Sequence, residues 1–451
     1  MKPSLPKGTR DFTPQQTLRR QYIFQTIQKV FVKYGFQPIE TPAMESLSTL
    51  TGKYGEEGDQ LLFKVLNNGD FLSKANAQAL EARDSAALVS SISKRGLRYD
   101  LTVPFARFVV MNQNDLTFPF KRYQIQPVWR ADRPQKGRYQ EFYQCDVDVV
   151  GSDSLLFEAE LTQIYDEVFT ALQLPVVVKL NNRKILAGMA EAAGIGDRFV
   201  EMTMAIDKLD KIGVEGVKKE LSSRGIDEQA TEKIEQVLAV KELSELSAFF
   251  ADSETGQKGI EELKTVFDLL SDVQLNNQMQ FDVTLARGLN YYTGCIFEVK
   301  VDTAAHPDIV MGSIGGGGRY DDLTGVFGMK DMSGVGVSFG AERIYDVLEE
   351  LNLYPETVAQ NLKVVILTFD KVTFRYGFKI LQQLRTAGIA AELYPEPTKM
   401  KKQMKYANGR DVPYTIVIGS QEMESGELSL KHMKSGEQEK LNIESIVDRL
   451  S

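Results

Sequence analysis

The sequence predicts an α+β protein built on an antiparallel sheet, with a helical insertion and a C-terminal α/β domain. Two strand-like runs flank a polar loop within residues 121–151, which is typical of a long antiparallel hairpin. Residues 182–271 have a helical pattern of mixed charge between two strand-rich regions. Strands and helices alternate after residue 362, as in a small domain with a mostly parallel sheet.

The first half of the chain contains clear helix and strand signals. Thr13 and Pro14 are suited to an N-cap and a first helical position, and Gly35 is typical of a residue that ends a helix. Apolar residues recur between them at roughly helical spacing. The other elements expected before the insertion are two hairpin strands, a helix and a short strand, at residues 122–129, 139–149, 155–172 and 176–180.

The second half resumes with strands and ends in an alternating pattern. After the insertion we expect two strands, a helix and a linker, at residues 280–286, 295–301, 340–351 and 352–361. In the C-terminal domain we expect strands at residues 363–369, 391–394 and 414–418. A helix that ends at residue 387 follows the first strand, and a helix near residues 399–406 follows the second. We therefore predict a core in two segments, residues 1–181 and 272–351, with an insertion at 182–271 and a C-terminal domain at 362–451.

Composition excludes several classes of protein. A chain of 451 residues is long enough for two or three domains. Its two cysteines, Cys145 and Cys295, cannot form a disulfide framework or a four-thiolate zinc site. The two histidines, His306 and His432, exclude a multi-histidine metal centre. No apolar run approaches the ~20 residues of a membrane span, and the N-terminus has no signal-peptide core. We therefore expect a cytoplasmic protein with no membrane partner.

The hairpin loop is the first candidate for chemistry, because it concentrates positive charge. Its cations are Arg130, Arg133, Lys136 and Arg138. Arginine can bond two phosphate oxygens at once, so the loop suits phosphate binding. Phe142 follows with a ring on which a base could stack, and Gln144, Asp146 and Asp148 alternate along the next strand. The alternative is a solvated turn with surface ion pairs.

Two further arginines stand beside glycines. Arg287 precedes Gly288 and the phenols Tyr291 and Tyr292, and Arg343 opens a helix after a glycine-containing run. Taken singly, each fits a structural arginine as well as a functional one. The glycines at 315–318 are not a GxGxxG between a strand and a helix, and no GxxxxGK[ST] loop is present. The glycine run therefore indicates tight turns or close backbone approach.

Together these segments resemble the histidyl-tRNA synthetases, a family of class II aminoacyl-tRNA synthetases. Residues 130–144 resemble motif 2 of that class, and GVGVSFGAERI at 334–344 resembles motif 3. LARGLNYYTG and GGGGRYDDL resemble the histidine-specific signature and its companion segment. RYDLTVPFARF, PKGTRDF and ETPAMESLSTL resemble a pocket segment, the N-terminus and the motif 1 region. The last 90 or so residues resemble an anticodon-binding domain, so the resemblance spans essentially the whole chain.

The resemblance implies a ligase that activates L-histidine with ATP and transfers it to the 3′ end of tRNA(His). Arg130, Arg287 and Arg343 are the implied catalytic residues. The implied ATP-binding residues are Arg130, Arg138, Phe142, Arg287 and Arg343, with Mg²⁺ carried by ATP and neither zinc nor an organic cofactor. The implied histidine-binding residues are Asp100, Thr102, Arg130, Gln144, Asp148, Arg287, Tyr291 and Tyr292. No tight metal site on the protein is implied.

The resemblance also implies macromolecular partners. Arg133 and Gln135 are placed toward the tRNA acceptor end, and the basic run Lys401, Lys402 and Lys405 toward the tRNA backbone. The helical insertion is expected to clasp the acceptor arm, the alternative being a packing insert. The family further implies a homodimer through motif 1.

Two departures from the family pattern concern the amino-acid pocket. Asn290 replaces the usual aspartate of the signature, which removes a charge beside the pocket. Asp100 and Asp148 stand where many bacterial members have glutamate.

Three alternatives remain. The first is the synthetase-like regulatory subunit of ATP phosphoribosyltransferase, which does not aminoacylate and should lack both the C-terminal domain and intact arginines. The second is a class II synthetase for another amino acid, against which the signature at 287–292 argues. The third is a stand-alone nucleic-acid-binding protein. From residue 360 the chain holds 14 Lys and Arg against 11 Asp and Glu, but its net charge of −9 makes the remaining body acidic and disfavours the third alternative.

Overall fold

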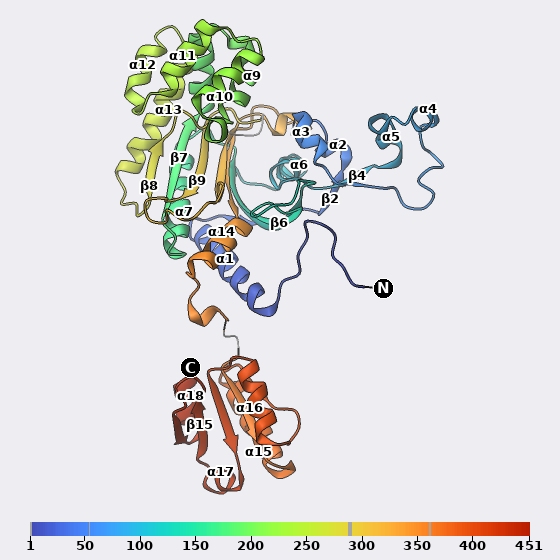
Figure 1. The fold of residues 1–451 in the computed structure, drawn as a ribbon, viewed down its shortest axis with the longest axis vertical. Helices are drawn as coiled ribbons and strands as arrows, with labels where there is room; N and C mark the ends of the chain where they lie inside the picture. The colour runs from blue at the N-terminus through green and yellow to red at the C-terminus, as the bar shows by residue number, and fades with distance from the viewer. Residues whose placement is uncertain (1, 54, 287–290, 360–361) are drawn as a thin grey trace. The chain divides into compact units, whose positions relative to one another are not determined.

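The structure is a computed structural model that describes every residue except 1, 54, 287–290 and 360–361. It consists of two compact units, Met1–Leu353 and Tyr354–Ser451. The first unit holds an eight-stranded sheet, a three-stranded sheet and a group of helices, and the second holds a five-stranded sheet (Figure 1).

The eight-stranded sheet is the frame of the first unit. Its strand order is β1-β5-β6-β11-β10-β9-β7-β8, and neighbours are antiparallel except for the edge pairs β1–β5 and β7–β8. In that order the strands are Gln37–Pro38, Phe120–Trp129, Glu141–Val150, Gly334–Gly340, Gly315–Tyr320, Cys295–Val301, Val176–Asn182 and Gln278–Phe281. The α+β fold on an antiparallel sheet is confirmed.

Three helices cover one face of this sheet, which leaves the other face for the site. They are α1 (Pro14–Lys33), α7 (Leu156–Ala171) and α14 (Ala341–Leu351). Rings from α1 and α7 pack on Phe339 of β11, with centroids 4.7 Å away for Tyr165 and 5.7 Å for Phe31. Residues that alternate with Phe339, such as Ser338, therefore point to the opposite face.

Strand β10 explains the glycine run as close backbone approach. A Cβ on Gly317 would lie 2.2 Å from the Gly336 carbonyl oxygen, and one on Gly318 would lie 2.9 Å from the Tyr292 ring. Both distances are shorter than any tolerated contact, so only glycine fits between β9 and β11 here.

The insertion consists of helices, of which α8 and α13 contact strand β7 of the large sheet (Figure 1). They are α8 (Arg183–Ala192), α9 (Phe199–Ile206), α10 (Leu209–Ser223), α11 (Glu228–Leu238), α12 (Leu246–Phe249) and α13 (Glu254–Ser271), with short 3-10 helices at Gly196–Arg198 and Leu243–Glu245. The longest, α13, packs on α8, where Gly188 and Gly256 allow close approach of the two backbones.

The small sheet β2-β4-β3 carries the remaining N-terminal elements. Its strands are Met44–Ser46, Arg95–Leu97 and Lys64–Val65, in that order. The helices around it are α2 (Leu47–Leu50), α3 (Gly55–Gln60), α4 (Ala77–Glu81), α5 (Ser85–Ile92) and α6 (Thr102–Asn112). Helix α6 enters a main hydrophobic core, where Phe105 and Val109 are fully buried, and Leu50 of α2 lies in the same core.

The prediction of a strand over residues 280–286 was wrong in its extent. The strand ends at Phe281, because Asp282 turns the chain. The Asp282 Oδ1 accepts hydrogen bonds from the Thr284 backbone N–H at 3.0 Å and from its hydroxyl at 2.5 Å. Such local bonds from an aspartate side chain favour a turn over a strand.

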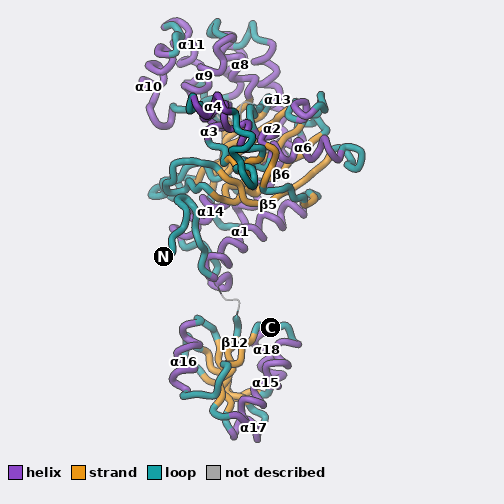
Figure 2. Tube along the Cα trace, turned by 90° about the vertical axis from the view of Figure 1, so that its right-hand side faces the viewer, coloured by secondary structure: helices purple, strands orange, loops and turns teal. Residues whose placement is uncertain are grey.

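The second unit is the expected α/β domain, with a mixed sheet instead of a mostly parallel one. Its order is β13-β12-β14-β15-β16, with strands Ala391–Leu393, Val364–Thr368, Tyr414–Ile418, Leu428–His432 and Gln438–Leu441. The first three are parallel and the last two antiparallel. Figure 2 shows α16 (Met400–Gly409) on one side of the sheet and α15 (Lys371–Thr386) and α18 (Ile443–Leu450) on the other. Helix α17 (Ser420–Ser425) and the 3-10 helices Thr324–Phe327 and Glu356–Ala359 complete the described elements.

Glycine at 317 should be required for stability of the first unit. The change Gly317→Ala forces the β10 and β11 backbones apart and should lower the free energy of unfolding by about 1–3 kcal/mol, as overpacking does. The control is Gly196→Ala, whose Cβ would meet only a side-chain atom 3.7 Å away. Urea unfolding followed by circular dichroism checks both, and equal stability of the two variants would contradict the close approach.

Candidate active site

A cavity of about 150 Å³ opens on the face of the large sheet opposite α1 and α7. Its walls come from β6, β10 and β11, the start of α6 and the segment that follows residue 290. The lining residues are Asp100, Thr102, Arg130, Gln144, Asp146, Asp148, Tyr291, Tyr292, Gly316, Gly317, Tyr320, Gly336, Val337 and Ser338. Seven of the eight residues expected to bind histidine lie among them, and the eighth, Arg287, lies outside the described residues.

Two buried carboxylates line this cavity in front of one buried arginine. Asp148 and Arg122 are cross-strand partners on β6 and β5, and the Asp148 Oδ2 lies 2.7 Å from the Arg122 Nη2. The Tyr320 hydroxyl donates to the other oxygen, Oδ1, at 2.7 Å. Both oxygens of Asp148 are thus held by protein groups.

Asp146 is the second carboxylate, two residues earlier on the same face of β6. The Gln144 Nε2 donates to its Oδ1 at 3.4 Å. Burial raises the pKa of Asp146 to about 7, opposed by the Arg122 charge and reinforced by Asp148. The pKa of Asp148 is also raised by burial, and Arg122 and the Tyr320 hydroxyl counter that rise.

Arg130 brings positive charge to the same cavity. Its Nε donates to the Tyr99 carbonyl at 3.0 Å and its Nη2 to the Gln144 Oε1 at 3.4 Å. Its guanidinium lies over the rings of Tyr99 and Phe142, 4.2 and 5.2 Å from their centroids. These contacts fix the orientation of the guanidinium at the end of β5.

Asp100 and Tyr291 meet on another wall. The Asp100 Oδ1 accepts from the Val103 backbone N–H at 3.1 Å, and the Tyr291 hydroxyl donates to its Oδ2 at 3.5 Å. Tyr292 is half-buried and packs edge-on against Tyr291, and burial together with the nearby Asp148 raises the pKa of its phenol. Its phenol therefore stays protonated and can donate or accept a hydrogen bond near neutral pH.

The arginines expected at the ATP side lie around the hairpin loop. The Arg343 Nε donates to the Gly137 carbonyl at 2.9 Å, and its Nη1 donates to the Ser313 carbonyl at 2.6 Å. Arg138 is half-exposed and lies 3.7 Å from Asp132. Arg343 and the loop are therefore brought together, as the two motifs require.

The expected tRNA-binding residues are not among those that line the cavity. Arg133 and Gln135 are exposed on the hairpin loop. Lys401, Lys402 and Lys405 are exposed on α16 in the second unit.

Several cavity residues were missed by the sequence-based assignment. They are Asp146, Ser338, Tyr320 and the glycines at 316, 317 and 336. The alternation of polar residues at 144, 146 and 148 was a usable signal for Asp146. Gly336 had no such signal, because glycine is required there by a contact with a residue of another strand. A Cβ at position 336 would lie 1.9 Å from the Asp148 Oδ1.

The described part of the chain has neither a metal-binding cluster nor a membrane-spanning helix. No group of three or more His, Cys, Asp or Glu side chains there could hold a metal ion. No helix there is long and apolar enough to cross a bilayer.

The antiparallel sheet with this cavity and the separate α/β unit give the class II synthetase-like fold. Residues 70–344 match the family model for histidyl-tRNA synthetase, and residues 363–451 match the anticodon binding domain. The histidine–tRNA ligase of Christiangramia forsetii is 56% identical, with 99% of this chain and 98% of the relative covered. The histidine–tRNA ligase of Bacteroides fragilis strain YCH46 is 54% identical, with 100% of this chain and 99% of the relative covered. The histidyl-tRNA synthetase structure from Nostoc sp. PCC 7120 is 32% identical, with a TM-score of 0.83 and full coverage of both chains. This chain belongs to the histidyl-tRNA synthetase family, as the sequence predicts.

The buried Asp146 should make stability depend on pH with a definite sign. Its folded pKa of about 7 exceeds the ordinary value of 3.8 for an aspartate, so ionisation disfavours the folded state. The contribution of Asp146 to the free energy of unfolding therefore falls as pH rises from about 4 to 7. Asp146→Asn should stabilise the protein more at pH 8 than at pH 5, by about 1–3 kcal/mol.

Urea unfolding of wild type and variant at the two pH values measures this difference. The exposed Asp308→Asn controls for loss of a carboxylate. An equal gain at both pH values would contradict the raised pKa.

Proposed function

We propose that this chain is a histidine–tRNA ligase, which activates L-histidine with ATP and transfers the histidyl group to tRNA(His). The observation that carries this proposal is the cavity. It combines three aspartates, three phenols and an arginine. This set suits a small molecule with a carboxylate at one end and two basic nitrogen-containing groups, as in histidine.

Asp100, Thr102 and Gln144 are assigned to the α-ammonium of histidine. Asp100 presents a carboxylate that is 2% exposed and fixed by the Val103 N–H, and Thr102 adjoins it at the start of α6. Gln144 lies within hydrogen-bond reach of Arg130, which is assigned to the substrate carboxylate.

We assign the imidazole to Asp146, Asp148 and Tyr292, with Tyr291 alongside. Asp148 already accepts from Tyr320 and pairs with Arg122, so its role is to fix the charge and shape of the wall. Asp146 then supplies the carboxylate that accepts from the imidazole N–H. A charge-assisted bond of this kind contributes about 1.5–3 kcal/mol.

Activation is an in-line displacement at the α-phosphorus. A histidine carboxylate oxygen forms the new bond to phosphorus, and the bond from phosphorus to the bridging oxygen breaks as pyrophosphate leaves. Arg130 and Arg287 are assigned to the negative charge on the α-phosphate, by positioning and electrostatics. ATP enters as its Mg²⁺ complex, in which the metal neutralises charge on the outer phosphates.

Phe142 and Arg343 are assigned to the adenine, with Arg138 and Arg343 toward the γ-phosphate. The bond from Arg343 to the Gly137 carbonyl supports this, because it holds the loop next to the start of α14. Arg343 can stack by its planar guanidinium, as Phe142 can by its ring.

Transfer to tRNA would then take place at the same cavity. The terminal ribose hydroxyl attacks the carbonyl carbon of the adenylate, AMP leaves, and a phosphate oxygen takes the hydroxyl proton. Arg133 and Gln135 face the acceptor end, the region 182–271 clasps the acceptor arm, and the second unit contacts the anticodon. Lys401, Lys402 and Lys405 add backbone attraction without base reading.

The regulatory alternative is disfavoured by what the chain retains. The α/β unit is complete, and Arg130 and Arg343 both lie at the site. A non-catalytic relative has no need of either arginine.

We propose that the chain acts as a cytoplasmic homodimer. Exposed apolar side chains near the small sheet support a partner there, namely Met44, Leu66, Phe71, Leu72, Leu80 and Met111. A second copy would cover them.

ATP–pyrophosphate exchange without tRNA tests the activation step. Wild type should exchange with histidine and with none of the other nineteen amino acids. Asp146→Asn should raise the KM for histidine about 10- to 100-fold, since the charge-assisted bond is weakened. Its KM for ATP should change little. Exposed Asp308→Asn is the matched control. No exchange with any amino acid would contradict the ligase proposal and favour the regulatory alternative.

Substitution of the α16 lysines separates the two half-reactions. The triple change of Lys401, Lys402 and Lys405 to alanine should lower tRNA charging at low tRNA concentration several-fold, because three contacts with tRNA phosphates are lost. The same variant should retain wild-type pyrophosphate exchange, which serves as its internal control. An equal loss in both assays would mean that α16 supports the fold and not tRNA binding.

A further inference from the structure

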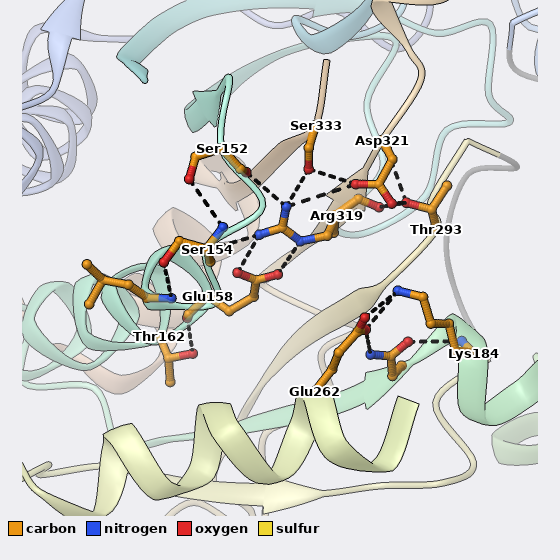
Figure 3. A network of polar contacts seen from close by, with 12 residues as sticks. Ser152, Ser154, Glu158, Thr162, Lys184, Glu262, Thr293, Arg319, Asp321 and Ser333 are labelled. Carbon is orange, nitrogen blue, oxygen red and sulfur yellow. Dashed lines mark hydrogen bonds and ion pairs between the residues drawn. The ribbon is translucent and has the colours of Figure 1, made fainter. Parts of the chain in front are cut away.

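Asp321 lies just outside the cavity and joins two of its walls. It follows β10 directly, and its side chain is 42% exposed. The Thr293 hydroxyl donates to its Oδ2 at 2.6 Å, and the Ser333 hydroxyl donates to its Oδ1 at 2.7 Å (Figure 3). Thr293 comes directly after Tyr291 and Tyr292, and Ser333 directly before β11.

The hydrogen-bond directions at both hydroxyls are fixed by the backbone and by Arg319. The Thr293 hydroxyl accepts from the Asp321 backbone N–H at 3.1 Å. The Ser333 hydroxyl accepts from the Arg319 Nη1 at 2.5 Å. Each hydroxyl therefore has its proton available for Asp321, which must present two acceptors. A carboxylate does so, whereas an amide presents one acceptor and one donor group.

Arg319 makes this arrangement rigid. It is 4% exposed, and it forms a two-bond ion pair with Glu158 of α7, at 2.5 Å from Nε and 2.7 Å from Nη2. Its carbonyl also accepts from the Thr293 backbone N–H at 2.8 Å. Figure 3 shows Arg319 between Glu158 on one side and Ser333 and Asp321 on the other. The position of Asp321 is thus set from the buried side of the sheet.

We propose that Asp321 is a positioning residue for histidine recognition, which holds the segment of Tyr291 and Tyr292 in register with β11. It acts through Thr293 on the two phenols and through Ser333 on the strand that carries Gly336 and Ser338. The inference rests on the proposed function, because histidine is taken as the ligand of the cavity. It adds to the site a residue that touches neither substrate nor cavity.

Steady-state pyrophosphate exchange with the full-length protein tests this role. Asp321→Asn and Asp321→Ala should raise the KM for histidine about tenfold, because Tyr291 and Tyr292 would be displaced from their positions in the cavity wall. The KM for ATP should stay within about twofold of wild type. Thr293→Val should raise the KM for histidine in the same direction, and Thr293→Ser, which keeps the hydroxyl, should restore it. Asp322→Asn, at the exposed neighbouring carboxylate, is the matched control and should leave both constants unchanged.

The double variant Asp321→Ala with Thr293→Val decides whether Asp321 acts through Thr293. If it does, the double variant should have the KM of Asp321→Ala alone. Independent, multiplicative rises would overturn the proposal, and so would a loss of kcat and of thermal stability with unchanged KM, which marks a merely structural role. Wild-type exchange with histidine is measured first: its absence would refute the proposed function, while unchanged KM values in active variants would refute only the role of Asp321.

Discussion

The ion pair between Arg122 and Asp148 is the constraint around which the site is arranged. Arg122 is fully buried, and a buried charge is tolerated only when it is paired. The cross-strand register of β5 and β6 places Asp148 opposite it, and the Tyr320 hydroxyl donates a hydrogen bond to the Oδ1 of Asp148. Asp146 faces the same guanidinium, so one cation serves two carboxylates. Burial then leaves Asp146 with a raised pKa, and a cationic or hydrogen-bond-donating ligand would stabilise its ionised form.

Space for that ligand comes from the absence of side chains on β10 and β11. A Cβ at 336 would overlap Asp148, and one at 318 would overlap Tyr292, so the glycines allow these two groups to lie against the sheet. Glycine is unfavourable within a strand because it loses more backbone entropy on folding. Hydrogen-bonded neighbours on both sides of β10 offset that cost. The cavity is therefore a feature of the sheet itself, and the loops around it add groups to a preformed wall.

The sequence was sufficient for the elements that have a local signal. The helix from Pro14, the hairpin around its charged loop and the alternating C-terminal unit each follow from caps, periodicity or turn residues. The residues expected to bind histidine came from motif resemblance, and the structure places the described ones around one cavity. What the sequence could not supply were pairings between distant residues. Asp148 was assigned to the substrate by the resemblance, and its pairing with Arg122 across the hairpin carries no signal in the sequence. Asp321 and Thr293, 28 residues apart, gave no reason to be considered together.

The two halves of the site differ in how firmly they are held. The amino-acid cavity rests on buried groups, such as Arg122 with Asp148 and Arg319 with Glu158, and breaking a buried pair is costly. The hairpin loop is instead tied to α14 by the exposed ion pair of Lys136 with Glu350 at 2.8 Å and by the partly buried bond from Arg343 to the Gly137 carbonyl. Exposed pairs contribute about 0–1 kcal/mol each. Histidine would therefore meet a preformed cavity, whereas ATP and the acceptor end would meet a loop whose cations can be rearranged at low cost.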